Sequence, residues 1–131
     1  MIKYALVGCG NIGTKRLKSI SSNKNSKLVI IAGPKNKSKS CKALELSKLF
    51  NCKYTNNWKK IFDEDIDAVI LSTPTKLFNK IGSEILNRKK HLLVEKPLGR
   101  NINEAKNLTK LAIKNKVLLK TGFNLRFDTG I

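Results

Sequence analysis

Short runs of apolar residues alternate along the chain with longer stretches in which apolar and charged positions recur at helical spacing. The runs predict strands at residues 3–7, 28–32, 52–55, 68–72, 91–95 and 117–123. The longer stretches predict helices at about residues 11–23, 38–50 and 77–88, and one from Asn101 or Asn103 to Asn115, with a helical turn around Trp58. This alternation, with strands that are continuously apolar, predicts an α/β protein. We expect a Rossmann-type, doubly wound parallel sheet of about six strands in a three-layer αβα arrangement.

Two of the expected helices carry an apolar face. These faces consist of Leu46, Leu49 and Phe50 in the helix at 38–50, and of Ile81, Ile85 and Leu86 in the helix at 77–88. We expect the second set, in the helix at 77–88, to face inward.

The chain has 131 residues, which corresponds to about one ordinary domain. None of its apolar runs approaches the ~18 residues of a membrane span. The first apolar run stops at Gly8, so no signal peptide is predicted, and we expect a soluble, cytoplasmic protein without a membrane partner. The three cysteines, Cys9, Cys41 and Cys52, are odd in number and never two residues apart. This spacing favours reduced thiols over a disulfide framework or a metal site.

The formal net charge of +18 raises the question of a nucleic-acid partner. The positive charge is almost all lysine, is spread along the whole chain, and is not interleaved with aromatic residues as single-strand binding would require. Lysine, asparagine and isoleucine have A- and T-rich codons, so a compositional bias of the genome accounts for the excess. We expect no specific nucleic-acid binding, although the chain should adhere to polyanions at low salt.

A glycine-rich segment, Gly8-Cys9-Gly10-Asn11-Ile12-Gly13, lies directly between the first strand and the first helix. In this GxGxxG pattern Gly8 permits the tight turn, Gly10 lets the backbone approach a pyrophosphate, and Gly13 lets the helix pack close to the strand. The helix N-terminus then offers free N–H groups and a positive dipole end to the phosphates. The segment predicts a dinucleotide site, although a tight turn alone also accounts for the glycines.

The residue expected to hold the ribose 2′-hydroxyl, about 20 positions further on, is Gly33 rather than an acidic residue. Lysines follow it at positions 35, 37 and 39. Without a carboxylate nothing repels a 2′-phosphate, and Lys35 and its neighbours would neutralise one. The cofactor is therefore NADP or NAD, with NADP favoured, unless these lysines form only a solvated loop.

A second candidate segment, Glu95-Lys96-Pro97, follows the strand at 91–95. Ligands of open α/β sheets bind outside the carboxyl ends of the strands, where Thr73-Pro74-Thr75 should also lie. A lysine at this edge can donate a proton to a carbonyl or alkoxide during hydride transfer. Position alone does not distinguish Lys96 from the other lysines.

Four segments, in order and spacing, resemble the N-terminal NAD(P)-binding domain of the Gfo/Idh/MocA (glucose-fructose oxidoreductase/inositol dehydrogenase-like) family. They are the glycine segment from Val7 to Gly13, Asp67 to Thr75, Lys90 to Pro97, and Gly122 to Phe127. The resemblance implies hydride transfer between NAD(P) and a hydroxyl or carbonyl of a sugar, nucleotide sugar, polyol or related substrate. It further implies that residues 1–124 form the dinucleotide-binding domain and that 125–131 begin the connection to a substrate domain that is missing here.

The resemblance also assigns roles to individual residues. Lys96 would be the catalytic residue near the reacting oxygen, and a cis peptide before Pro97 would orient it. The other cofactor-binding residues would be Gly8, Gly10, Asn11, Ile12, Gly13, Gly33, Lys35, Ser72, Thr73, Pro74, Glu95, Pro97 and Asn124, while Arg126 would lie near the domain junction. His91 matches a family position without a catalytic role, so we expect it to be structural.

The chain also departs from the family pattern. Phe78 stands where a histidine is common, Lys89 replaces a common glycine just past a helix end, and Gly33 replaces the usual acid. A left-handed conformation at Lys89 would cost about 1 kcal/mol. A truncated gene, an incomplete read and one half of a split enzyme all remain open explanations of the missing domain. A homo-oligomer or a separately encoded C-terminal half is accordingly the expected protein partner. The alternatives to an enzyme domain are a non-catalytic nucleotide sensor and a polyanion-binding protein.

Overall fold

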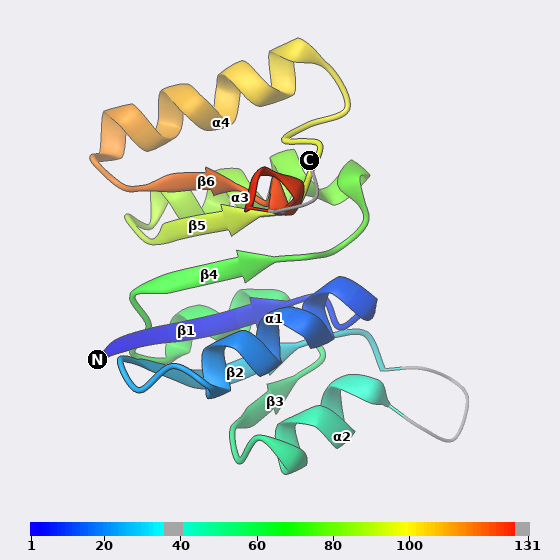
Figure 1. The fold of residues 1–131 in the computed structure, drawn as a ribbon. Helices are drawn as coiled ribbons and strands as arrows, with labels where there is room; N and C mark the ends of the chain where they lie inside the picture. Colours follow the sequence, from blue (N-terminus) through cyan, green and yellow to red (C-terminus); the bar gives the residue numbers. More distant parts are fainter. Residues whose placement is uncertain (36–40, 128–131) are drawn as a thin grey trace. The chain divides into compact units, whose positions relative to one another are not determined.

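The computed structural model describes residues 1–35 and 41–127, in which strands and helices alternate along the chain (Figure 1). The strands are β1 (Ile2–Val7), β2 (Ser26–Ala32), β3 (Lys53–Thr55), β4 (Ala68–Leu71), β5 (His91–Val94) and β6 (Leu119–Thr121). The α-helices are α1 (Asn11–Ser21), α2 (Lys42–Leu49), α3 (Phe78–Asn87) and α4 (Ile102–Asn115). Three 3-10 helices complete the order: η1 (Trp58–Asp63), η2 (Thr75–Leu77) and η3 (Asn124–Phe127).

The strands follow the order β3-β2-β1-β4-β5-β6. Strand β1 pairs in parallel with β2 and β4, β2 pairs in parallel with β3, and β5 pairs in parallel with β6. Parallel strands in this order with interleaved helices make a Rossmann-type α/β fold. The fold class predicted from the sequence is therefore confirmed.

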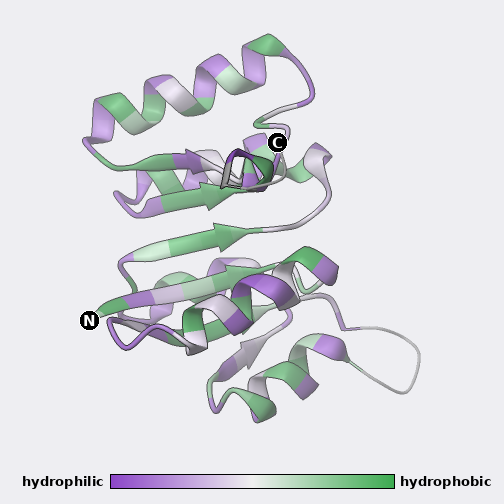
Figure 2. Cartoon of the chain, in the orientation of Figure 1, coloured by the Kyte–Doolittle hydropathy of each residue, from purple (hydrophilic) through white to green (hydrophobic). Residues whose placement is uncertain are grey.

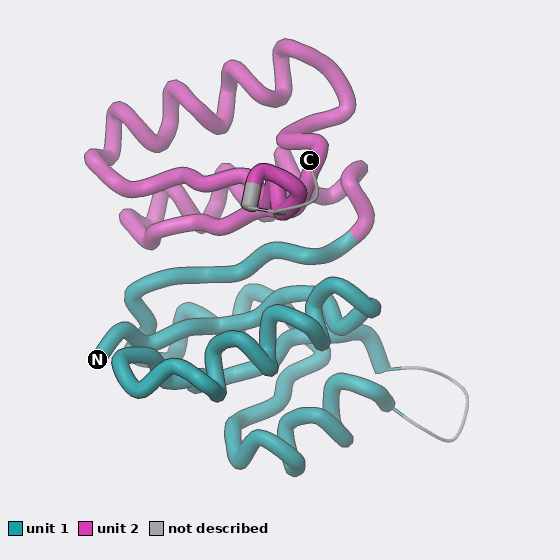
Figure 3. The backbone as a smooth tube through the Cα atoms, viewed as in Figure 1, with its two compact units in different colours: residues 1–73 teal, residues 74–131 magenta. Residues whose placement is uncertain are grey.

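The chain divides into two compact units, residues 1–73 and residues 74–131, which are coloured separately in Figure 3. Unit 1 contains β1 to β4, α1, α2 and η1. Its core consists of strand residues such as Ala5, Leu6, Ile31 and Val69, all with 0% exposure, and Figure 2 shows β4 coloured as hydrophobic along its length. Burial on both sides explains why these strands are apolar at consecutive positions.

Unit 2 contains α3, β5, α4 and β6, and its helices pack against each other through a small residue. A Cβ atom on Gly82 of α3 would lie 3.1 Å from Cδ2 of Leu108 in α4 and 3.2 Å from Cδ2 of Leu92 in β5. Phe78, the first residue of α3, is 1% exposed. It therefore contributes to the core of unit 2.

Most predicted elements are present with shorter ends, and three details need correction. The helix predicted at 38–50 begins at Lys42 after a non-helical Cys41, and residues 36–40 lie outside the described residues. Of the apolar face predicted for this helix, Leu46 is buried and Phe50 half-buried, whereas Leu49 is 76% exposed and does not contribute to the core. The strand predicted at 117–123 is only Leu119–Thr121.

Two local details of unit 2 concern residues that the sequence singled out. Asn101, and not Asn103, caps α4. Lys89, just past the end of α3, has a φ of 56°, so it adopts the left-handed conformation whose cost is about 1 kcal/mol. Within the two described ranges, no helix is both long and apolar enough to cross a membrane.

Candidate functional site

The carboxyl ends of the central strands of unit 1 lie level with one another. The register pairs Val7 of β1 with Ala32 of β2 and with Leu71 of β4. The residues that follow are linked by hydrogen bonds: Gly8 N–H donates to Ala32 O (2.9 Å), and Ser72 N–H donates to Val7 O (2.8 Å). This edge is where ligands of open α/β sheets bind.

Two glycines of the loop after β1 are required by their surroundings. Gly8 has a φ of 99°, and a Cβ atom there would lie 2.6 Å from the backbone carbon of Ser72. A Cβ atom on Gly13 would lie 2.3 Å from Gly8 O and 2.8 Å from Ser72 Oγ. The loop and the first turn of α1 therefore pack directly on the strand ends, as the sequence predicted for both positions.

Gly10 differs from these two glycines because a Cβ atom on it would meet nothing within 4 Å. It is the N-cap of α1, where no side chain forms a capping hydrogen bond and no acidic residue lies in the first turn. Its φ of −69° and ψ of −171° are extended and open to any residue. The packing of unit 1 therefore does not explain a glycine here, whereas close approach of a ligand to the backbone does.

The amide groups at this end of α1 are suited to an anion. Asn11 and Ile12 begin the helix and are exposed, while Gly13 is buried beneath them. The first N–H groups of a helix have no partner within the helix and present a positive dipole end. A phosphate or pyrophosphate matches both features.

The segment after β4 provides a second indication of a ligand. Ser72 Oγ donates to Gly8 O at 2.8 Å, which ties this segment to the glycine loop. The adjacent Thr73 Oγ1 is buried and has no hydrogen-bond partner within the described residues. Because a buried hydroxyl without a partner is costly, this atom is a candidate for a ligand contact. The open Gly10 and the unpartnered Thr73 both fit a dinucleotide on this edge.

The end of β2 carries no carboxylate. Gly33 is buried and donates its N–H to Thr55 O at 3.1 Å, while Lys35 is exposed. Lys37 and Lys39, also expected to neutralise a 2′-phosphate, lie outside the described residues.

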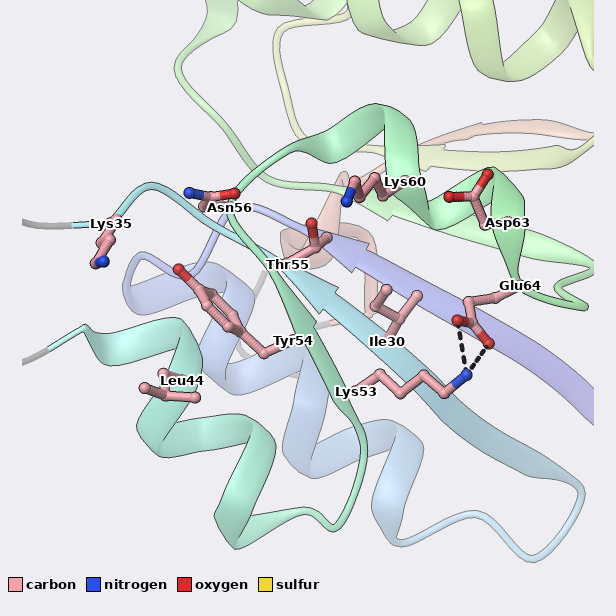
Figure 4. A pocket seen from close by; sticks show the side chains of 10 residues that line it. All are labelled: Ile30, Lys35, Leu44, Lys53, Tyr54, Thr55, Asn56, Lys60, Asp63 and Glu64. Atoms are coloured by element: carbon pink, nitrogen blue, oxygen red, sulfur yellow. Dashed lines mark hydrogen bonds and ion pairs between the residues drawn. The ribbon is translucent and has the colours of Figure 1, made fainter.

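Lys35 lines an open pocket of about 630 Å³ that the sequence did not predict (Figure 4). Its other lining residues are Ile30, Leu44, Lys53, Tyr54, Thr55, Asn56, Lys60, Asp63 and Glu64. Lys53 forms an ion pair with Glu64 at 2.8 Å, whereas Lys35 and Lys60 have no ion-pair partner within the described residues. Pairing of β2 with β3 brings these residues together, so a strand order was needed to find them.

Two thiols lie beside the residues that follow β2. Cys9 Sγ lies 3.4 Å from the position of a Cβ atom on Gly33. Burial raises the pKa of the Cys9 thiol to about 11. Cys41 donates to the hydroxyl of Tyr54 at 3.2 Å, and this contact together with burial raises the pKa of Tyr54 to about 12. The Cys9 thiol is therefore protonated at neutral pH, and none of the three cysteines forms a disulfide.

The remaining predicted residues belong to unit 2 and follow β5. Glu95 is buried at 9% exposure, whereas Lys96 is exposed. The peptide between Lys96 and Pro97 is cis, as the family resemblance implied. Pro74, at the start of unit 2, and Asn124, at the start of η3, are exposed. Unit 2 therefore presents one accessible cation directly after a parallel strand.

His91 has a structural contact at the other end of β5. Its Nδ1 accepts a hydrogen bond from Leu118 N–H at 3.0 Å, and Leu92 N–H donates to Leu118 O at 2.9 Å. The imidazole therefore extends the pairing of β5 with the segment that leads into β6. This is the structural role expected from the sequence.

Comparison with known proteins identifies the family to which these features belong. The family model described as "Oxidoreductase family, NAD-binding Rossmann fold" (Gfo/Idh/MocA) matches residues 2–123. The inositol 2-dehydrogenase of Rhizobium meliloti is 27% identical over 127 residues, which cover 97% of this chain and 37% of that protein. The chain thus spans little more than a third of the length of that relative.

Two solved structures show the same fold at low identity. GenD2 of gentamicin A biosynthesis, in complex with NAD, has a TM-score of 0.90 and 21% identity, covering 96% of this chain and 35% of its own. KijD10, a 3-ketoreductase from Actinomadura kijaniata in complex with NADP, has a TM-score of 0.84 and 23% identity, covering 93% and 37%. With the match over residues 2–123, the chain belongs to the Gfo/Idh/MocA oxidoreductase family and carries its NAD(P)-binding Rossmann domain.

Proposed function

We propose that the chain binds NADP or NAD on the glycine loop, as the cofactor domain of an oxidoreductase. The substrate class we propose is a sugar, nucleotide sugar or polyol-like molecule, since inositol dehydrogenases are among the relatives. The observation that carries the proposal is the uncapped N-terminus of α1. Its N-cap Gly10 has open space where a side chain would be, although both neighbouring glycines of the motif are tightly packed.

Different residues of unit 1 would contact different parts of the dinucleotide. The amides of Asn11, Ile12 and Gly13 would hold the pyrophosphate at the end of α1, where Gly10 allows it to approach the backbone. Thr73 would gain a partner for its buried hydroxyl from the bound molecule.

We further propose that NADP is preferred. The end of β2 presents buried Gly33 in place of a carboxylate, so nothing there repels a 2′-phosphate. Lys35 lines the pocket beside β3, and Lys35 and Lys60 are cations without an ion-pair partner within the described residues. A pocket with unpaired lysines favours the cofactor that carries the additional negative charge.

Catalysis would need unit 2 and a substrate domain. A bound nicotinamide supplies the hydride acceptor or donor for the substrate carbon. We propose that Lys96, exposed after β5, exchanges a proton with the reacting oxygen, with Glu95, Pro97 and Asn124 completing its surroundings. Residues 1–124 would be the cofactor domain, and residues 125–131 would lead towards the substrate domain present in the longer relatives.

The test is a fluorescence titration of NADPH and of NADH against the purified chain at low and at moderate salt. Saturable binding that persists at moderate salt, with a lower Kd for NADPH, is the expected result. Gly10→Glu should abolish it, because the carboxylate would occupy the open space at the helix end and repel phosphates. Lys110→Met, at an exposed position of α4, is the matched control: it lowers the net charge by one unit, as Gly10→Glu does, and should leave both Kd values unchanged. Binding that disappears with salt, or that survives in Gly10→Glu, would refute the proposal.

A further inference from the structure

The residue after β2 is glycine for a reason other than backbone conformation. Within the described residues, Gly8 alone among the glycines has a positive φ, so the backbone of Gly33 is open to any residue. Gly33 is nevertheless buried, and its N–H is held by Thr55 O at 3.1 Å. What restricts this position is therefore the space around it.

That space is filled by Ala43, in the first turn of α2. A Cβ atom on Gly33 would lie 2.7 Å from the Cβ of Ala43, which is closer than two carbon atoms can approach. The same Cβ would lie 3.4 Å from Cys9 Sγ on its other side. Any side chain at position 33 must therefore displace Ala43, and the Cβ of an alanine cannot move without its helix.

The helix that carries Ala43 is not free to withdraw. Ala43 is 2% exposed, and α2 packs against both β2 and β3. A carboxylate at the end of β2 is the group that hydrogen-bonds the ribose 2′-hydroxyl of NAD and disfavours the 2′-phosphate of NADP. The packing of α2 thus bears directly on which dinucleotide the end of β2 accepts.

We propose that Ala43 is a cofactor-specificity residue that acts through position 33. Its methyl group leaves space only for glycine at position 33. No carboxylate can then stand at the end of β2 to bind the ribose 2′-hydroxyl, and a 2′-phosphate has space there beside Lys35. Ala43 is a positioning residue, since it excludes a side chain and does not itself contact the cofactor. This inference rests on the proposed dinucleotide site and adds the residue that sets its selectivity.

The experiment is a double-mutant cycle of Gly33→Asp and Ala43→Gly, with Kd values for NADH and NADPH by fluorescence and melting temperatures for all four proteins. Gly33→Asp alone should lower the melting temperature and weaken both dinucleotides without a gain for NADH. Ala43→Gly alone should leave the ratio of the two Kd values within twofold of wild type. The double variant should recover part of the melting temperature and shift the ratio at least tenfold towards NADH.

A matched control separates the specific contact from general loosening of α2. Ser47 is also buried on α2, at 3% exposure, so Gly33→Asp with Ser47→Gly should not show the recovery or the shift. If the wild-type chain binds dinucleotide, two outcomes would overturn the inference. One is a shift of the Kd ratio in Gly33→Asp alone, and the other is a double variant whose ratio does not shift. A wild-type chain that binds neither dinucleotide would instead refute the proposed function, and this inference with it.

Discussion

Helices α1 and α4 both follow a parallel strand, but the N-terminus of α4 is capped by side chains and that of α1 is not. At α4, Asn101 Oδ1 accepts from Glu104 N–H at 3.0 Å, and Glu104 Oε2 accepts from Arg100 N–H at 2.8 Å. The Arg100 guanidinium also donates to Glu104 Oε1 at 2.6 Å. At α1 the N-cap is Gly10, with no capping side chain and no acidic residue in the first turn.

The difference indicates which helix end is structural and which is kept for a ligand. At the end of α4, the Asn101 side chain satisfies the Glu104 amide group, and the Glu104 carboxylate in the first turn counters the helix dipole. The end of α1 leaves the same groups available, which reduces stability unless an anion binds there. Substitutions at the two ends should therefore separate folding from cofactor binding.

The largest effect should come from Gly13→Ala, one turn into α1. The new methyl group would lie 2.3 Å from Gly8 O, which is a backbone atom that cannot rotate away. We expect the free energy of unfolding in urea to fall by about 3 kcal/mol, the upper part of the range for an overpacked site. An unchanged free energy would mean that the close packing of α1 on the glycine loop is incorrect.

Gly10→Asn should have the next largest effect, on binding rather than on folding. The side chain fits, since nothing lies within 4 Å of the Cβ position, and asparagine is a good N-cap. We expect the free energy of unfolding to rise by about 0.5 kcal/mol while dinucleotide affinity falls by about tenfold or more, because the cap takes the amide groups of the phosphate site. Equal affinity in this variant and wild type would show that α1 is not the phosphate site.

The contrast between these glycines also shows which features of the site could be predicted from the sequence. The spacing of the motif identified all three positions, and the capping pattern narrowed the start of α4 to Asn101 or Asn103, because both signals depend on neighbours within a few residues. The sequence could not show that Gly13 is required by Gly8 O and Ser72 Oγ, whereas Gly10 is not required by packing at all. That distinction depends on strand ends brought together from distant segments.

Long-range packing also explains the errors. Leu49 fits the apolar face of a helix, yet the short α2 ends there and leaves the side chain exposed. The pocket beside Lys35 combines the ends of β2 and β3 with η1, and no local pattern predicts that combination. Gly33 was recognised only as a missing acid, because its close approach to Ala43, ten residues further on, depends on how α2 packs against β2.

Asn101→Ala should have a smaller effect than either glycine substitution. It removes the acceptor for Glu104 N–H at the start of α4, and loss of an N-cap costs about 1 kcal/mol. Dinucleotide affinity should be unchanged, since the proposed phosphate site is the end of α1. Urea unfolding and a titration with NADPH measure the two quantities. A loss of affinity comparable to that in Gly10→Asn would remove the distinction between the two helix ends.

The smallest effects should appear as a difference in pH dependence between the two units. Glu104 of unit 2 has its pKa lowered by hydrogen bonds from Arg100, so its stabilising contribution is present above its ordinary pKa and is lost as the pH falls. Cys9, beside the glycine loop of unit 1, has its pKa raised by burial from an ordinary 9.0 to about 11. Below pH 9 its contribution is fully present, because the thiol is protonated in both the folded and the unfolded chain.

Between pH 9 and 11 the unfolded chain releases the Cys9 proton while the folded chain retains it, so the free energy of unfolding should fall over this range. Urea unfolding from pH 8 to pH 11 should therefore show that the stability difference between wild type and Cys9→Ser shrinks as the pH rises. Cys52→Ser provides the control. Burial raises the Cys52 pKa to about 11 as well, so this variant should show the same pH dependence if burial, rather than the glycine loop, is its cause. A stability difference that stays constant from pH 8 to 11 would contradict the burial of Cys9 against Gly33, and with it the close packing on which the selectivity of this strand end depends.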